Sequence, residues 1–215
     1  MSNTWEQLAA PFDPKDIEWR VGSTNTAKDS GMALAYITKQ AAQKRLNDVV
    51  GIDKWQSIYQ IEGDKVFICS ISIRVNNEWI TKSDGAGQTD FEGIKGGISD
   101  AFKRAATGWG IGTYLYYADT QWAPIKAQGK SYVFVDPSKL QVKIGGKVVS
   151  ATTNPIDLAK EQLIKVMTTD YPSIFKNAQD IAKVLKELGM SIRTMDDVED
   201  AKATLFEYAE QKVER

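Results

Sequence analysis

The stretch KVFICSISIRV, residues 65–75, carries the clearest structural pattern in this chain. Apolar side chains recur at every second position from Phe67 onward, whereas Ser70, Ser72 and Arg74 occupy the alternate positions. Because successive side chains of a strand point to opposite faces, the alternation predicts a strand with one buried and one polar side.

Turn residues flank this strand on both sides. Glu62-Gly63-Asp64 precedes it and Asn76-Asn77 follows it, and such residues are typical of hairpin turns. The segments beyond these turns, Trp55–Ile61 and Glu78–Lys82, also have the composition of strands. The sequence therefore predicts a three-stranded antiparallel meander with one buried face.

A long helix is predicted directly after the meander, over Thr89–Trp109. An apolar stripe follows one side of this helix, and polar residues with three glycines fall on the other side. The stripe contains Ile94, Ile98, Ala101, Phe102, Ala105 and Trp109, and the glycines are Gly93, Gly96 and Gly97. Each glycine costs about 1 kcal/mol relative to alanine inside a helix. Either another element packs closely there, or a ligand approaches the backbone.

The rest of the chain mixes shorter elements. We expect a short helix over Ser2–Ala10, strands over Ile17–Gly22, Tyr132–Val135 and Leu140–Ile144, an extended-then-helical segment over Met32–Val50, and C-terminal helices over Asp180–Leu188 and Met195–Val213. The predicted fold class is α+β, with the meander packed against the long helix and a small helical region at the C-terminal end.

Charge divides the chain into three segments. Residues 1–120 carry 13 basic and 15 acidic side chains, residues 121–153 carry five lysines against one aspartate, and residues 154–215 carry 9 basic and 12 acidic side chains. We therefore expect a core over 1–120, a basic extended or β segment over 121–153 that completes it, and a small acidic helical domain over 154–215.

Composition excludes several classes of protein and site. With 27 basic and 28 acidic side chains the net charge is −1, so any nucleic-acid contact must come from a local patch rather than a uniformly basic surface. The absence of histidine excludes histidine-based acid–base chemistry. Cys69 is the single cysteine, which excludes an internal disulfide and a cysteine-cluster zinc site. No stretch has the length and apolarity of a membrane span or a signal peptide, which predicts a soluble, cytoplasmic protein.

Two glycine patterns resemble nucleotide-binding loops only in part. Gly129-Lys130-Ser131 matches the end of a phosphate-binding loop, but Pro124 replaces the first glycine and a strand follows. The glycines of the 108–112 segment follow a helix rather than a strand. Both patterns favour turns, and neither suggests a nucleotide cofactor.

Three carboxylates around the start of the long helix could hold a metal ion. Asp84, Asp90 and Glu92 would be the ligands of a metal-dependent nuclease. Carboxylates at a helix N-terminus are also stabilised by the helix dipole, which explains Asp90 and Glu92 more simply. We prefer a site without metal and keep the nuclease as an alternative.

Lys103 and Arg104 are the residues that we expect to bind a ligand. They lie on the glycine-bearing side of the long helix, and Arg74 with its neighbouring serines offers a second polar surface. The following basic segment interleaves lysines with Tyr132 and Phe134. Cations that follow phosphates, with aromatic side chains nearby, are typical of sequence-tolerant single-strand binding.

The stretch ISDAFKRAA, residues 98–106, is followed by Trp109-Gly110 and by Tyr114-Leu115-Tyr116. Tyr36-Ile37, Leu46-Asn47, Gly51 and Trp55 precede it in the same order along the chain. Together with the meander, these residues resemble the annealing domain of the Rad52/Rad22 recombination proteins and their bacteriophage relatives, over roughly residues 15–120.

This resemblance implies a protein that anneals single-stranded DNA without ATP, in homologous recombination and repair, and not an enzyme. It also implies a homo-oligomeric ring or helical arc with a groove that holds one strand by its backbone. By position, the paired basic residues of the family fall on Lys103 and Arg104, and its early groove arginine falls on Arg20. Lys65 and Lys95 stand where relatives have basic groups.

Two departures from the family pattern are visible. Thr107 stands where an arginine is usual, and Asp84 and Asp90 make the preceding loop acidic. We expect lysines of the basic segment to take over part of the strand contact, Lys130 among them, with Lys126 and Lys139. Protection of strand ends without annealing remains an alternative. The C-terminal region could contact a single-strand-binding protein or a neighbouring subunit, and no motif separates these two.

Overall fold

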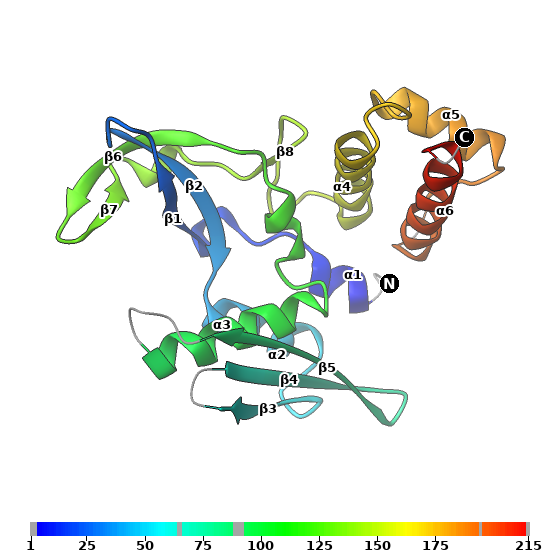
Figure 1. Cartoon of the computed structure of the whole chain (residues 1–215). Coiled ribbons are helices and arrows are strands. Elements are labelled where there is room, and N and C mark those ends of the chain that lie inside the picture. Colours follow the sequence, from blue (N-terminus) through cyan, green and yellow to red (C-terminus); the bar gives the residue numbers. More distant parts are fainter. Residues whose placement is uncertain (1–3, 64–65, 88–92, 194, 214–215) are drawn as a thin grey trace.

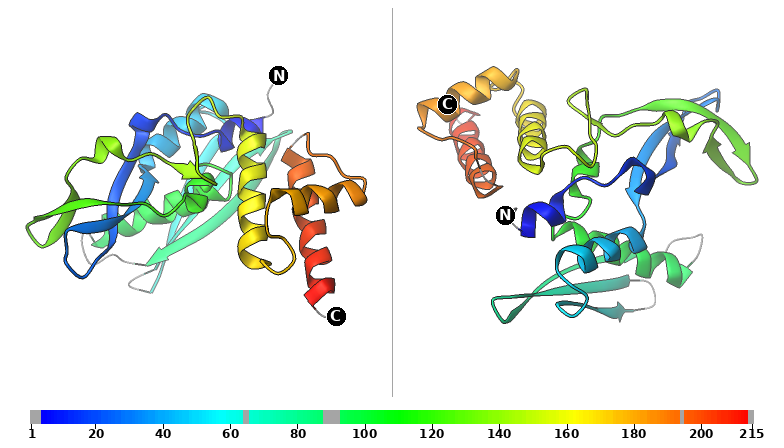
Figure 2. Two further views of the ribbon diagram at one scale, coloured as in Figure 1. Left: turned by 90° about the horizontal axis from the view of Figure 1, so that it is seen from above. Right: turned by 180° about the vertical axis from the view of Figure 1, so that it is seen from behind.

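The computed structural model describes residues 4–63, 66–87, 93–193 and 195–213, and it has the predicted α+β fold (Figure 1). A three-stranded sheet covered by helices forms the body. A four-stranded sheet forms an arm, and three helices form the C-terminal part. The two views in Figure 2 place the arm and the C-terminal helices at opposite ends of the molecule. No helix of the described chain is both long and apolar enough to cross a membrane.

The predicted meander is confirmed. Strands β3 (Trp55–Glu62), β4 (Val66–Val75) and β5 (Glu78–Gly87) pair antiparallel in that order. Asn76 and Asn77 have φ angles of 49° and 67°, as a hairpin turn with two left-handed residues requires. Strand β5 continues beyond the predicted end at Lys82, because its residues stay paired with β4 up to Gly87.

Helix α3 (Gly93–Thr107) packs on the apolar face of this sheet, as predicted. Gly97 is buried there, although its position in the helix repeat predicts the polar side. A Cβ at Gly97 would lie 2.2 Å from Cδ2 of Phe67, so glycine is needed for the close approach of helix and sheet. Ile94 was expected in the apolar stripe but is 62% exposed.

Strands β1 (Ile17–Thr24), β2 (Ser30–Ile37), β6 (Trp122–Gln128) and β7 (Ser131–Phe134) form the arm, in the order β1-β2-β6-β7. One face of the arm has its own small core, formed by Ala33, Ile125, Phe134 and Leu140. Gly129 has a φ of 60° in the turn between β6 and β7, which confirms a polar turn instead of a phosphate-binding loop.

Helices α1 (Thr4–Ala9) and α2 (Lys39–Val49) lie beside α3. Tyr36 and Ile37 are the last residues of β2, and α2 starts after the N-cap residue Thr38. Arg45 of α2 anchors the N-terminal segment. Its guanidinium donates hydrogen bonds to the carbonyl oxygens of Gln7, Leu8, Ala10 and Pro11 at 2.5–3.2 Å and lies 4.1 Å from the ring centroid of Phe12.

Turns, short 3-10 helices and a small hairpin connect the larger elements. Gly110 and Gly112 have positive φ angles in the turn that ends the helix, as predicted. Short 3-10 helices are η1 (Pro14–Asp16), η2 (Thr113–Tyr117) and η3 (Pro137–Lys139), and a small hairpin consists of β8 (Lys143–Ile144) and β9 (Lys147–Val148). The strand predicted over Leu140–Ile144 is therefore only two residues long.

The C-terminal part consists of α4 (Pro155–Asp170), α5 (Ala178–Glu187) and α6 (Met195–Val213) around one apolar cluster. Asn154 caps α4 through its side-chain oxygen, which accepts a hydrogen bond from the Ile156 amide at 2.8 Å. Lys165 of α4 donates to the Tyr117 carbonyl at 2.7 Å and to Asp119 at 2.8 Å. These bonds attach α4 to the end of the body.

Candidate nucleic-acid interface

The polar side of α3 carries Asp100, Lys103, Arg104 and Thr107, while Ala101, Phe102, Ala105 and Ala106 on its other side are buried against the sheet and its neighbours. Since this apolar packing fixes the rotation of the helix, the polar side has one orientation. Lys103 and Arg104 are consecutive residues, so their side chains leave the helix about 100° apart.

Lys103 points toward the arm. Its Nζ lies 5.4 Å from the ring centroid of Tyr36 on β2 and forms an ion pair with Asp100 at 2.8 Å. A cation above a tyrosine ring is attracted by the ring quadrupole. The body and the arm therefore meet at Lys103 and Tyr36.

Tyr36 connects Lys103 to the charges of β1. It pairs directly with Glu18, and Arg20 lies one step further along the same face, opposite Leu34. Burial raises the pKa of Tyr36 to about 12, helped by the hydrogen bond and negative charge of Glu18, while the positive charge of Arg20 acts in the opposite direction. Arg20 and Lys103 are thus both near one aromatic ring, although 83 positions separate them in the sequence.

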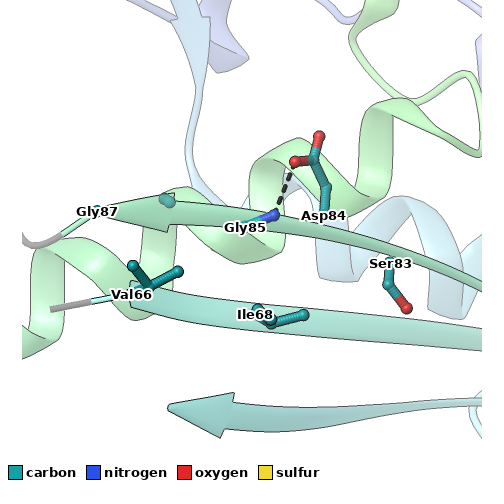
Figure 3. Close-up of a pocket in the computed structure, with 7 residues that line it drawn as sticks. Val66, Ile68, Ser83, Asp84, Gly85 and Gly87 are labelled. Atoms are coloured by element: carbon teal, nitrogen blue, oxygen red, sulfur yellow. Dashed lines mark hydrogen bonds between the residues drawn. The ribbon is translucent and has the colours of Figure 1, made fainter. Parts of the chain in front are cut away.

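Arg104 points to the other flank of α3, toward β5. Its Nε donates to Oδ1 of Asp84 at 3.1 Å, and the same oxygen accepts the Gly85 amide at 2.7 Å. Figure 3 shows Asp84 on the α3 side of β5, with the bond from Gly85 drawn. Asp84 therefore holds Arg104 in place and reduces the local positive charge.

Of the three carboxylates that could serve as nuclease ligands, the structure describes only Asp84. Asp84 is engaged with Arg104 and Gly85, whereas Asp90 and Glu92 lie outside the described residues. Within the described ranges, no three carboxylate, thiol or imidazole groups gather closely enough to hold a metal ion.

The remaining predicted contact residues do not join this site. Arg74 is exposed on β4 opposite Trp79, on the sheet face that α3 does not cover. Lys130 is exposed at the turn that follows β6, at the tip of the arm, and Lys95 is exposed in the first turn of α3. Lys65 lies outside the described residues.

The polar surface predicted from Ser70, Ser72 and Arg74 lies on the sheet face that α3 does not cover. Ser70 is paired with Ser83 and Ser72 with Thr81, each at 2.8 Å between the hydroxyl oxygens, so these hydroxyls satisfy one another within the sheet. Nearby, a shallow pocket is lined by Val66, Ile68, Ser83, Asp84, Gly85, Ala86 and Gly87 (Figure 3). None of the described residues that line it is cationic, and we do not assign phosphate binding to it.

Two lysines near the site were not predicted, and both have structural partners. Lys82 of β5 donates to the Gly108 carbonyl at 2.5 Å and lies 4.8 Å from the ring centroid of Trp109. Lys39, the first residue of α2, lies 5.0 Å from the ring centroid of Tyr59. A cation at the last carbonyls of a helix complements its dipole, so Lys82 closes the C-terminal end of α3.

Comparison with known proteins identifies one matching family and two similar proteins. The sequence matches the family described as "Rad52/22 family double-strand break repair protein" over residues 1–134, which include strands β1–β7 and exclude α4–α6. The single-stranded DNA-binding protein DdrA of Deinococcus radiodurans is 31% identical over 126 residues, which cover 57% of this chain and 59% of that protein. DdrA of Deinococcus deserti is 30% identical over 125 residues, with coverages of 57% and 61%. The match thus spans about three fifths of either relative.

Proposed function

Because this chain belongs to the Rad52/22 family of double-strand break repair proteins, we propose that it binds single-stranded DNA by the phosphate backbone and pairs it with a complementary strand. The observation that carries the proposal is that Lys103 contacts the ring of Tyr36, and that the register of β1 and β2 puts Arg20 on the same face of the arm as Tyr36. The names of the DdrA relatives, which are single-stranded DNA-binding proteins, support it.

Backbone contacts suit this activity physically. Lys103, Arg104 and Arg20 would neutralise phosphates and leave the Watson–Crick edges for the second strand, so that base pairing rather than the protein reads the sequence. The step requires charge neutralisation and exposure of bases, and neither needs ATP or a metal ion.

A single subunit would hold a strand weakly. Two of the three cations already contact carboxylates, Lys103 with Asp100 and Arg104 with Asp84. We therefore propose that subunits assemble into a ring or helical arc, because repeated sites along one strand raise the effective concentration of each contact. In this assembly, the chain would act in recombination and repair of broken DNA.

The first experiment measures binding of a fluorescent oligothymidine by anisotropy at several salt concentrations. The double variant Lys103→Ala with Arg104→Ala should bind at least about tenfold more weakly and show a shallower salt dependence, by about 0.7 per lost phosphate contact. Lys183→Ala with Lys186→Ala is the matched control, because it removes two exposed lysines from α5. Equal affinity of both double variants and the wild type would remove α3 from the strand site.

A second experiment separates the activities. Complementary labelled oligonucleotides should pair faster with the protein than without it, in the absence of ATP. Binding without faster pairing would indicate strand protection instead of annealing. Incubation of the same strands with Mg²⁺ or Mn²⁺ should leave them intact, and cleavage that disappears in Asp90→Asn would favour the nuclease.

A further inference from the structure

We propose that one face of the arm is a base-stacking surface that continues the phosphate site of α3, with Trp122 as its main contact. This aromatic face consists of Met32, Leu34 and Tyr36 of β2 and Trp122 of β6. The inference rests on the proposed function, because it assigns the bases of the same bound strand to a part of the molecule outside α3.

Strand register places these side chains together. Met32 pairs with Trp122, Leu34 with Arg20, and directly paired residues lie on the same face of a sheet. Met32, Leu34 and Tyr36 alternate along β2, so they also share that face. From Tyr36, beside Lys103, the face extends along β2 by four residues to Met32, which is about 13 Å.

The opposite face of the arm is already occupied. Ala33 and Ile125 are buried there against Phe134 and Leu140. On the aromatic face, Trp122 is 49% exposed, and Met32, Leu34 and Tyr36 are half-buried. The exposed ring of Trp122 thus lies at one end of the aromatic face, where a base could stack on it, and Lys103 lies at the other end.

Gly22 leaves room for this surface. A Cβ at Gly22 would lie 2.7 Å from Cδ1 of Leu34 and 3.1 Å from Cε of Met32. The missing side chain lets Leu34 and Met32 cover the β1 edge and form a continuous apolar strip up to Trp122.

Exposed cations accompany the strip, which favours a polynucleotide over an apolar protein partner. Arg20 is exposed beside Leu34, and Lys126 is exposed on β6, four residues after Trp122 and therefore on the same face of that strand. Aromatic side chains for the bases and cations for the phosphates are the two components of single-strand binding surfaces, and each stacked base contributes through its π face whatever its sequence. At about 3.4 Å per stacked nucleotide, 13 Å corresponds to about four nucleotides.

The test compares two strands of equal length, about 20 nucleotides, one of thymidines and one of abasic sugar-phosphate. The wild type should prefer the strand with bases. Trp122→Ala should weaken binding of that strand about 5- to 20-fold and leave abasic binding nearly unchanged, because stacking requires a base. Trp122→Phe should restore most of the preference.

Trp79→Ala is the matched control, because Trp79 is 45% exposed on the outer face of the three-stranded sheet. It should keep the wild-type preference for bases. Circular dichroism and light scattering of each variant report its fold and its oligomeric mass.

The outcomes distinguish this inference from the proposed function. If the wild type binds neither strand, the proposed function is wrong and the aromatic face has no such role. If binding depends on Lys103 and Arg104 but Trp122→Ala keeps the wild-type preference for bases, only the inference about the face is wrong. A changed oligomeric mass with unchanged preference would make Trp122 a contact between copies of the chain, which also overturns it.

Discussion

Asp100 competes with DNA for Lys103 in the proposed site, so removing its charge should strengthen strand binding. The Lys103–Asp100 pair is 2.8 Å long, and its side chains are 26% and 42% exposed. Partly exposed pairs of this kind contribute about 0.2–1 kcal/mol. A phosphate that takes over Lys103 must first overcome that attraction, and it is also repelled by the aspartate.

Asp100→Asn keeps the shape of the side chain and removes both effects. The affinity for oligothymidine should therefore rise roughly 1.5- to 5-fold, which is the free energy of the pair expressed as a ratio of dissociation constants. The gain should shrink as salt is added, because salt screens charges that solvent can reach. Anisotropy titrations at about 50 mM and about 200 mM salt measure both effects.

Asp157→Asn is a control with the same change in net charge. Asp157 pairs with Lys160 of α4 at the same i,i+3 spacing, at 3.8 Å and outside the α3 site. It should leave binding within the error of the measurement. If Asp100→Asn binds no better than this control, or binds more weakly, Lys103 is not the phosphate contact and the reasoning fails.

Three other predictions concern the fold and its pH dependence. Gly97→Ala should destabilise the protein by about 1–2 kcal/mol in urea unfolding, because the clash with Phe67 exceeds the gain in helix propensity; higher stability would contradict the observed packing. Arg45→Lys should lower stability by about 1–3 kcal/mol and make the N-terminal segment more sensitive to protease, because lysine cannot reach four carbonyl oxygens as a guanidinium does. The pKa values of Tyr36 and Tyr114 are raised from 10.0 to about 12, so the protonated phenols favour the folded state, and the stability that they contribute below pH 10 should be lost between about pH 10 and 12. Ultraviolet titration of Tyr36→Phe should then show one fewer late-ionising phenol, and an unchanged count would be evidence against the assignment.

Local patterns determined how much of the fold could be predicted. The meander depends on alternation and on turn residues next to it, and both are visible within about thirty positions. Strand β6 was missed because Pro124 interrupts its pattern and its partner β2 lies some ninety positions earlier. The helix repeat alone placed Gly97 on the polar side, whereas the bulk of Phe67 on a separate strand decides that it is buried.

In the candidate site, too, contacts between residues close in sequence could be predicted, and contacts between distant residues could not. The Asp100–Lys103 pair has a spacing that a sequence reveals, since residues three apart on a helix are neighbours. The Asp84–Arg104 pair joins a strand to a helix and has no such signal. The expectation that Arg20 belongs with Lys103 came from the family resemblance. The sequence gives no sign that Tyr36 connects them, because this role depends on the pairing of β1 with β2.

The carboxylates around the cations bear on how annealing could proceed. Asp100 and Asp84 lower the positive charge that each subunit presents, so one subunit alone should release a strand quickly. In the proposed assembly, a strand held by many such subunits would stay bound, because all contacts must open together before it leaves. Annealing also requires the product duplex to leave, and each newly formed base pair stiffens the strand and removes bases from the aromatic face. Weak individual contacts would then let the duplex be released a few nucleotides at a time, whereas unopposed lysines and arginines would retain it. On this argument, Asp100→Asn should bind single strands more tightly and yet release the product duplex more slowly. A protein that only protects strands would show the tighter binding without needing to release a duplex.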